Sequence, residues 1–525
     1  MNDFEQSVYA MTLKWLLPVW CWAIYPVLFL YSRNRGLCTA DDLWRPLTVA
    51  LVVASVLWAL LSATLHSRAR GSLGSCALLL LFFAYGHIEG ALAPYEFALG
   101  PWIVGPNKVL IPAYFLTLAA LSWWLVSERR TQNELLRTVT VIGASLSVMA
   151  LIPGLHPANA HTPGNLEHLR EISLQAPAQD SSLPPIYLIV LDAYAGKPVL
   201  RDQYGFDNSS FLTSLRDRGF FVARESRSNY PQSILSLPSM LNFSYLRTLL
   251  PGVDEDERSR QPLQKILRYN QLFASLQPLG YQTITFDAAG WDVLNIPNSD
   301  VFYDTPGMQL NALENELVNT SLAGFLSRFL TSDRAESRAA FHRRRINYAF
   351  ERLGSIGDRE GPFIAYAHIG CPHQPFVFDS TGDPIPQDSD RFSTWFTGNQ
   401  VPDQEEYRRG YLGQLQYMNQ RVDDLIDRLL ATDRPRPIIM LVSDHGPAMD
   451  LHTESADQTN FRERFSNLVA VYFPDQDYSE LYETISLVNL IRVVLNEQFD
   501  ASLKLLPDQQ YYASWSRPYR MIQVP

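Results

Sequence analysis

Residues 186–192 read Ile-Tyr-Leu-Ile-Val-Leu-Asp, and this short stretch indicates the architecture of the second half of the chain. Six apolar residues end in the carboxylate of Asp192, with two prolines before them and a glycine-containing turn after them. A short apolar run between turn signals is typical of a strand that is buried on both faces. The stretch therefore predicts a central strand with Asp192 at its carboxyl end.

Similar apolar runs recur at 282–287, 363–368 and 438–444, with helical patterns such as 407–430 between them. Strands that alternate with helices predict an α/β sandwich around a largely parallel central sheet. Ligands of such sheets bind at the carboxyl ends of the strands. Because two of these runs end in aspartate and one in histidine, we expect their polar ends to meet at one edge of the sheet.

The first part of the chain differs, since long apolar runs with few charges dominate it. At roughly 20 residues each, five runs are long enough to cross the hydrocarbon core of a membrane. They cover residues 13–31, 46–65, 76–92, 109–126 and 139–155. The sequence thus predicts a five-helix transmembrane domain at 1–155, a linker with an interfacial helix at 156–185, and a catalytic domain at 186–525.

The distribution of basic residues predicts the orientation in the membrane. Loops 66–70 and 129–137 carry the clearest clusters of arginine, and positively charged loops stay on the cytoplasmic side. This rule places the chain after the fifth span outside, although Arg33 and Arg35 in the first loop oppose it. We therefore expect the catalytic domain on the outer face of the membrane.

The net charge excludes one class of partner. The formal charge is -11 and the pI is near 5.4, whereas nucleic acid is bound by clustered lysine and arginine. The triplet Arg343-Arg344-Arg345 is better interpreted as an exposed helix face. We therefore expect no nucleic-acid partner, and the lipid bilayer is the partner that the apolar runs predict.

Ser443-Asp444-His445-Gly446 is the strongest motif and lies at the end of the last apolar run. A carboxylate next to an imidazole offers two ligands to a metal ion, and the glycine would let the backbone turn closely around that ion. An ordinary turn is the alternative interpretation. Because Asp192 ends another predicted strand at the same edge, we favour a metal site.

Residues 228–246 form a second constellation, in which hydroxyl side chains alternate with Leu, Ile and Met at helical spacing. A serine that opens such a helix can receive a phosphate from the helix N-terminus and can be activated by a metal. The alternative is a serine that only caps the helix above a buried apolar face. The neighbouring metal motif favours the nucleophile.

Two histidines, His368 and His373, bracket a loop that reads His-Ile-Gly-Cys-Pro-His-Gln-Pro after a predicted strand. Histidines five residues apart in such a loop are placed to converge on an anion or a second metal. Satisfied surface histidines are the alternative. His452, seven residues past His445, is a weaker candidate of the same kind.

Together these residues resemble the alkaline phosphatase and sulfatase superfamily, and within it the membrane-anchored transferases of phospholipid head groups. Lipid A phosphoethanolamine transferases and lipoteichoic acid synthases are members. The resemblance covers nearly the whole chain, and Ser-Ile-Leu-Ser-Leu-Pro at 233–238 resembles the segment of the transferases' nucleophilic threonine. It implies Ser233 as nucleophile and these site residues: Asp192, Ser233, Asp444 and His445 at the first metal, and His368 and His373 at the head group or a second metal. His452 is a candidate for a further metal ligand from its position after the motif alone.

The resemblance also implies the activity. A divalent ion, zinc with manganese as the alternative, would activate Ser233 to attack a membrane phospholipid donor. The phosphoethanolamine or phosphoglycerol head group would pass through a covalent serine intermediate to an envelope glycan or lipid acceptor. The implied location is the bacterial inner membrane, with the catalytic domain on the periplasmic side.

The sequence differs from the phosphoethanolamine transferases in several places. Asp192 stands where they have glutamate, Asn229 and Ser239 stand where cysteines flank their nucleophile, and their last metal histidine lies further along. Sulfatases require Cys/Ser-x-Pro-x-Arg for formylglycine, and Ser233 is not followed by this pattern. A hydrolase of sulfate or phosphate esters and a non-catalytic membrane scaffold are the alternative functions.

Overall fold

A computed structural model describes the chain, which divides into two compact units, Met1–Asn159 with Met308–Thr331 and Ala160–Gly307 with Ser332–Pro525. The described residues are 3–34, 42–92, 97–99, 102–104, 106–127, 132–155, 174, 183–288, 294–306, 310–330, 333–386, 403–431 and 435–524. The interfacial helix expected within 156–185 lies outside the described residues.

The first unit contains five long apolar helices, each of which is long and apolar enough to cross a membrane. They are α1 (Asp3–Arg33), α2 (Trp44–Thr64), α3 (Arg68–Leu92), α4 (Pro106–Ser127) and α5 (Gln132–Leu155). Large apolar side chains are exposed on α2 and α4, as expected for surfaces that face lipid. The five predicted apolar helices are confirmed. A short antiparallel pair, β1 (Phe97–Leu99) and β2 (Trp102–Val104), lies between α3 and α4 along the chain.

Two further helices belong to this unit although they come much later in the sequence: α12 (Ala312–Asn319) and α13 (Leu322–Leu330). Leu313 and Leu317 of α12 are buried with Val27 and Leu30 of α1. The ring of Phe325 in α13 lies 5.2 Å from that of Tyr85 in α3. The sequence analysis had placed this segment within the catalytic half. Residues 312–330 belong to the first unit because apolar side chains of α12 and α13 pack against α1 and α3.

Polar contacts fix the start of this helical pair. Asn311 and Glu314 form a capping box at the N-terminus of α12. The Nε of Arg45, at the start of α2, donates to Oε1 of Glu314 at 2.6 Å. The side chain of Asn311 donates to the carbonyl of Asp42 at 3.0 Å. We refer to residues 310–330 as the docking hairpin.

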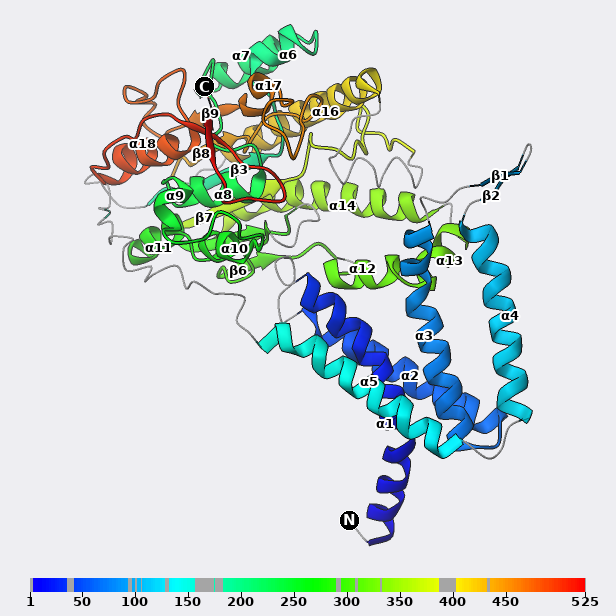
Figure 1. Ribbon diagram of the computed structural model, residues 1–525. Coiled ribbons are helices and arrows are strands. Elements are labelled where there is room, and N and C mark those ends of the chain that lie inside the picture. Colours follow the sequence, from blue (N-terminus) through cyan, green and yellow to red (C-terminus); the bar gives the residue numbers. More distant parts are fainter. Residues whose placement is uncertain are drawn as a thin grey trace. The chain divides into compact units, whose positions relative to one another are not determined.

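The second unit is built on a sheet whose strands follow the order β4-β9-β8-β3-β7-β5-β6 in the described part of the chain. Figure 1 labels β9, β8, β3, β7 and β6 of this sheet. The stretch from β8 to β6 is parallel, and β9 is antiparallel to both β8 and β4. The bounds are β3 (Ile186–Leu191), β4 (Phe221–Val222), β5 (Gln282–Phe286), β6 (Val301–Tyr303), β7 (Phe363–Ile369), β8 (Ile438–Val442) and β9 (Val469–Tyr472). The expected α/β sandwich with a largely parallel sheet is confirmed.

Alternate residues of β3 enter two different apolar cores. Leu188 and Val190 belong to one cluster, and Ile189 and Leu191 belong to the other. The first cluster includes side chains of α8 (Ser233–Leu241), α10 (Gln261–Arg268), α11 (Gln271–Leu276) and α18 (Leu487–Phe499). The second includes side chains of α7 (Ser209–Asp217), α14 (Asp333–Ser355) and α16 (Gln404–Leu430). The strand is therefore buried on both faces, as its continuous apolar sequence predicts.

The remaining elements of this unit are short. They are α6 (Lys197–Asp202), α9 (Leu246–Leu249), α17 (Phe461–Phe465), the 3-10 helices η3 (Gln277–Leu279) and η5 (Ile356–Asp358), and the antiparallel pair β10 (Gln510–Tyr512) and β11 (Ile522–Val524). The register of the central strands determines where their polar ends fall. Val190 of β3 lies opposite both His368 of β7 and Val442 of β8. The residues that follow Val190 and Val442 therefore reach the same edge as His368.

Candidate active site

Two buried carboxylates stand at the carboxyl edge of the sheet. Asp192 directly follows β3, and its main-chain N–H donates to the carbonyl of Ile369 at 2.9 Å. Asp444 lies two residues beyond β8, in a turn where the Ser443 hydroxyl donates to the carbonyl of His445 at 2.7 Å. The two aspartates are only 2% and 0% exposed. Burying two carboxylates together is unfavourable unless a cation or protons compensate their charge.

His368 completes a group that fits a divalent cation. Its Nε2 lies 3.4 Å from Oδ2 of Asp192 and 3.8 Å from Oδ2 of Asp444. One potential ligand atom from each of the three residues lies within 4.8 Å of the others. Oδ1 of Asp192, Oδ2 of Asp444 and both ring nitrogens of His368 are buried without a hydrogen-bond partner. Carboxylate oxygen and imidazole nitrogen suit zinc, with manganese as the alternative.

Their surroundings shift the pKa values of the two carboxyl groups in opposite directions. Burial and the charge of Asp192 raise the pKa of Asp444 to about 7. At Asp192 burial also acts upward, but the positive charge at His373 and the contact with His368 outweigh it and lower the pKa of that carboxyl. Like charges that share a buried site separate their pKa values in this way. A divalent cation would relieve the repulsion directly.

His445 presents an unprotonated ring nitrogen to the same site. Its Nδ1 lies 3.0 Å from the carbonyl of Gly446, and a carbonyl only accepts, so Nδ1 carries the proton. Nε2 is then the unprotonated nitrogen, 3.3 Å from Oδ2 of Asp444 and 3.6 Å from Oδ1 of Asp192. Burial and the charge of Arg464 hold the pKa of His445 well below its ordinary value. The imidazole is therefore neutral and able to bind a metal or accept a proton.

The glycine of the motif is required for a reason other than the one expected. A Cβ at Gly446 would lie 2.0 Å from the carbonyl oxygen of Glu463 and 2.6 Å from that of Ser466. The main chain of 463–466 therefore packs directly against Gly446. The sequence analysis attributed this glycine to a close turn around an ion, whereas the structure shows close packing against a neighbouring segment.

Ser233 is the hydroxyl that faces this group. It is the first residue of α8, and its Oγ lies 3.0 Å from Nε2 of His445. The N-cap position belongs to Gln232, so capping does not explain the serine. The other serines of the helix are used structurally, since Ser236 donates to the carbonyl of Asp444 and Ser239 to that of Ser244, each at 2.7 Å.

His373 lies beside the carboxylate group. Its main-chain N–H donates to the carbonyl of Asp192 at 3.0 Å, and its carbonyl accepts from Gln414 at 3.0 Å. Its ring centroid is 6.3 Å from that of His445. Burial lowers the pKa of His373. The imidazole of His373 therefore lies beside that of His445, which contacts Ser233. It does not belong to the group formed by Asp192, His368 and Asp444.

His452 is held by main-chain contacts away from these residues. Its N–H donates to the Thr459 hydroxyl at 3.1 Å, and its carbonyl accepts from the Tyr512 hydroxyl at 2.9 Å. Within the described residues, no contact joins its imidazole to Asp192, Asp444 or His445. A role for His452 in metal binding remains a prediction.

Arg464 is a site residue that the sequence analysis did not identify. It lies in α17, is 4% exposed, and its Nη2 is 3.2 Å from Nε2 of His445. An arginine 19 residues beyond the histidine carries no local pattern that could single it out.

Asp287, which ends β5 at the same edge, is neutralised by an arginine. Nε of Arg345 donates to Oδ2 of Asp287 at 2.7 Å, and both side chains are buried. Arg345 belongs to the triplet that was expected to form an exposed helix face. Arg344 is indeed exposed, but Arg345 points inward because it compensates a buried carboxylate. The carboxylate that follows β5 is therefore already paired with an arginine, whereas the charged neighbours of Asp192 are histidines.

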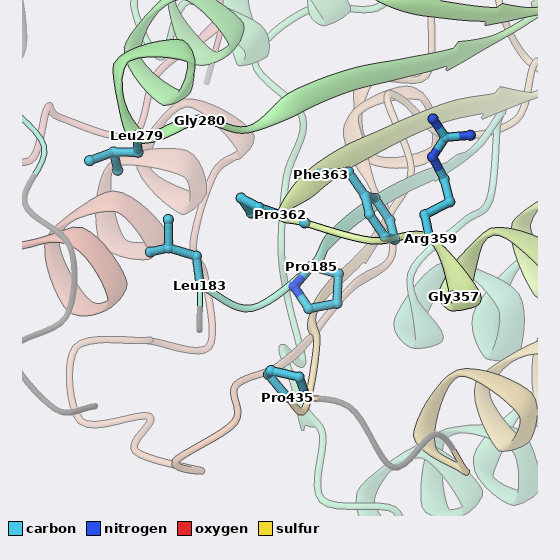
Figure 2. A pocket seen from close by; sticks show the side chains of 10 residues that line it. Leu183, Pro185, Leu279, Gly280, Gly357, Arg359, Pro362, Phe363 and Pro435 are labelled. Atoms are coloured by element: carbon cyan, nitrogen blue, oxygen red, sulfur yellow. The ribbon is translucent and has the colours of Figure 1, made fainter. Parts of the chain in front are cut away.

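A hollow of about 440 Å³ lies at the opposite, amino edge of the sheet (Figure 2). Pro185 precedes β3, Phe363 begins β7 and Pro435 precedes β8, and all three line it. Arg359 is the only charged lining residue, and none of the site residues named above is among them. The candidate site residues therefore lie at the carboxyl edge of the sheet and do not line this hollow.

Buried carboxylates and imidazoles with unpartnered ligand atoms, beside a serine that opens a helix at the edge of a parallel sheet, define an enzyme of the alkaline phosphatase superfamily type. The sulfatase family model matches residues 188–491. Since this match covers more than half of the chain, the protein belongs to the sulfatase family.

Solved structures with similar folds include phosphoethanolamine transferases. The C-terminal periplasmic domain of EcEptC from Escherichia coli, in complex with Zn, is 13% identical at a TM-score of 0.42, covering 67% of this chain and 96% of that chain. The integral membrane protein lipooligosaccharide phosphoethanolamine transferase A from Neisseria meningitidis is 11% identical at a TM-score of 0.36, covering 92% and 95%. A 2-O GAG sulfatase, BT1596, is 12% identical at a TM-score of 0.38, covering 64% and 74%. A search of curated protein sequences finds no match.

Proposed function

We propose that this enzyme transfers a phospho-head-group from a membrane phospholipid to an envelope glycan or lipid through a covalent intermediate on Ser233. The observation that carries the proposal is the 3.0 Å contact between Ser233 Oγ and Nε2 of His445, directly beside Asp192 and Asp444. A hydroxyl that faces an unprotonated imidazole and a cation site is placed to act as a nucleophile.

Each residue of the site has its own role in the first of two displacements, in which Ser233 attacks phosphorus. The Ser233 hydroxyl donates toward Nε2 of His445, which is held unprotonated by the Nδ1 contact with Gly446. Asp192, Asp444, His368 and His445 would hold the divalent ion, which supplies Lewis-acid stabilisation of negative charge and lowers the pKa of the serine hydroxyl. Ser233 also opens α8, whose N-terminus favours a phosphate.

The bond changes follow from this arrangement. A bond forms between Ser233 Oγ and phosphorus, and the bond from phosphorus to the glycerol oxygen of the lipid breaks. The serine proton is lost to solvent, and the diacylglycerol oxygen gains a proton from solvent. In the second displacement an acceptor hydroxyl attacks the same phosphorus, loses its proton to the site, and restores the Ser233 hydroxyl.

The five spans favour a lipid donor over a soluble substrate. Tethering a catalytic domain at a bilayer raises the effective concentration of lipid substrates. The docking hairpin adds a second attachment to the spans, because both of its ends continue into the catalytic unit. Conversion of Ser233 to formylglycine would need a different sequence after it, which disfavours sulfate ester hydrolysis.

The position of the docking hairpin also supports an outer catalytic domain. The hairpin contacts the end of α1, the start of α2 and the end of α3. The helix ends that adjoin the basic segments expected in the cytoplasm form a separate cluster, which contains Leu65, Leu73, Leu125 and Leu136. A reporter fused after Pro185 should therefore behave as periplasmic in a bacterial inner membrane. A reporter that is active only in the cytoplasm would overturn this topology.

Mass spectrometry of the intact protein tests the central step. Zinc-loaded enzyme is incubated with phosphatidylethanolamine or phosphatidylglycerol vesicles, quenched in acid and digested. We expect a phospho-head-group on the peptide that contains Ser233, and none in Ser233→Ala. Ser236→Ala is the matched control and should still be labelled, because its hydroxyl only donates to a main-chain carbonyl. Label on another residue, or formylglycine at 233, would contradict the proposal.

A further inference from the structure

We infer that Gln232 accepts a hydrogen bond from the head group of the donor lipid and thereby selects head groups that carry an N–H or O–H. The inference rests on the proposed function for the class of substrate, a phospholipid head group, and adds to it a residue that determines specificity. The sequence analysis assigned no role to Gln232, which directly precedes Ser233 in the chain.

The side chain of Gln232 does not cap the helix that Ser233 opens. Gln232 occupies the N-cap position of α8 with an extended backbone, and its side chain makes no capping hydrogen bond. N-cap positions favour serine, threonine, aspartate and asparagine, whose short side chains bond to the main chain of the first turn. The Nε2 of Gln232 instead donates to the carbonyl of Ala513 at 2.8 Å. Capping therefore does not explain the glutamine.

The partner of this amide lies in a segment near the C-terminus. We refer to residues 510–516, which include Ala513, as the C-terminal strap. The main-chain N–H of Trp515 in the strap donates to the carbonyl of Thr453 at 2.8 Å, in the segment that follows the metal motif. The strap thus joins that segment to the start of the nucleophile helix, and the amide of Gln232 lies where the strap meets the helix.

The other end of the amide is an acceptor without a partner. A main-chain carbonyl only accepts, so Nε2 of Gln232 faces Ala513 and Oε1 is the remaining atom. Gln232 is 8% exposed, and its Oε1 is buried. In the described part of the chain, no other buried side-chain amide atom lacks a hydrogen-bond partner. Gln414, for example, accepts from the N–H of Val377 at 2.8 Å and donates to the carbonyl of His373 at 3.0 Å.

The chemistry of this acceptor indicates which head groups it fits. A buried acceptor is unfavourable unless a donor pairs with it, and beside a nucleophile a substrate can supply that donor. Ethanolamine and glycerol head groups carry an ammonium or a hydroxyl on the second carbon from the phosphoester oxygen. Consecutive Cα atoms are about 3.8 Å apart, so a phosphorus bound at Ser233 brings this group close to the side chain of Gln232. Choline has neither N–H nor O–H there, so the site should reject it.

The alternative is that Gln232 only ties the C-terminal strap to α8, with a buried water at Oε1. Two substitutions separate these roles. Gln232→Glu keeps an acceptor oxygen but loses the N–H that donates to Ala513, whereas Gln232→Met loses both at a similar side-chain length. Tyr512→Phe is the matched control for the strap. It removes a hydroxyl that donates to the carbonyl of His452 at 2.9 Å and leaves Gln232 unchanged.

Calorimetry on full-length, zinc-loaded Ser233→Ala protein tests the inference without turnover. The probes are glycerophospho-N,N-dimethylethanolamine and glycerophosphocholine, two cations of similar size of which only the first has an N–H. We expect the dimethyl probe to bind at least about tenfold more tightly. Adding Gln232→Met should reduce this preference to within about twofold. Adding Gln232→Glu or Tyr512→Phe should preserve it.

Several results would overturn the inference. They are equal or undetectable binding of the two probes before Gln232 is changed, a preference that survives Gln232→Met, and a preference that is lost in Gln232→Glu or in Tyr512→Phe. The first and third results can be obtained even if Gln232→Met does not fold. Because no covalent step is involved, a preference that depends on Gln232 would stand even if Ser233 forms no adduct, and the two proposals can fail separately.

Discussion

Arg45 and Glu314 form an ion pair across 269 residues of sequence, with the Arg45 Nε donating to Oε1 of Glu314 at 2.6 Å. Glu314 is buried and also caps α12 together with Asn311. The pair therefore joins the first turn of α2 to the first turn of the docking hairpin. It also neutralises an arginine at the end of the bundle where the positive-inside rule disfavours one.

Reversing the charge of Arg45 should loosen the docking hairpin. In Arg45→Glu, two carboxylates would meet, and we expect roughly fivefold faster amide exchange in 312–319, a modest effect because Arg45 is partly exposed. The double variant Arg45→Glu with Glu314→Arg should recover most of the protection. Glu316→Arg, on the exposed face of the same helix, is the control and should change little. Equal exchange in all four proteins would show that the pair does not hold the hairpin.

Removing the Ser233 hydroxyl should stop turnover without removing the metal. Ser233→Ala should lower kcat by at least about a thousandfold, since a nucleophile acts in the transition state. Asp192, Asp444, His368 and His445 remain as ligands, so zinc content should stay near the parent value. Ser233→Thr should keep part of the activity because it retains the hydroxyl. If Ser236→Ala, which loses only a main-chain contact, is equally inactive, the assignment of the nucleophile is wrong.

Asparagine substitutions of Asp192 and Asp287, which both follow strands of the sheet, should have different effects on zinc binding and on stability. Asp192→Asn changes a carboxylate that we propose to bind the metal, so we expect loss of zinc and of the rise in Tm that zinc would produce. Asp287→Asn leaves Arg345 buried without its counter-charge, so the free energy of unfolding should fall by about 3 kcal/mol while zinc binding persists. Metal analysis with thermal melts in the presence and absence of zinc distinguishes them. Zinc loss in Asp287→Asn alone would place the metal elsewhere.

Zinc affinity should fall as the solution becomes more acidic. Burial and Asp192 raise the pKa of Asp444 to about 7, so below that pH a proton competes with the ion for this carboxylate. At His368 burial lowers the pKa, but Asp192 outweighs it and raises the pKa above the ordinary value, so a second proton competes there. Affinity should therefore drop roughly tenfold per pH unit for each proton. Asp192, whose pKa is lowered, and His445, whose pKa is far below its ordinary value, add nothing in this range. Competition titrations with a zinc chelator between about pH 5.5 and 8 measure the slope, and a flat profile would contradict these pKa shifts.

Features encoded by neighbouring residues were predictable from the sequence. The spans follow from apolar run length, and the central strands follow from runs bounded by turn residues. Asp192, His368 and Asp444 could be brought together because parallel strands end at one edge, a rule that needs no side-chain detail. The motif around Ser233 selected one hydroxyl of several, and the structure brings that hydroxyl to His445.

Features that depend on distant partners were decided only by the tertiary structure. Nothing local distinguishes Asp287 from Asp192, yet an arginine, Arg345, pairs with the first, whereas histidines surround the second and its Oδ1 has no hydrogen-bond partner. Arg464 reaches the site because the main chain of 463–466 packs against Gly446, and the docking hairpin joins the spans through a partner 269 residues away. The sequence by itself determined which chemical groups stand at the ends of its strands. Which of their charges remain uncompensated, and are therefore available to a metal or a substrate, was determined by packing between segments far apart in the chain.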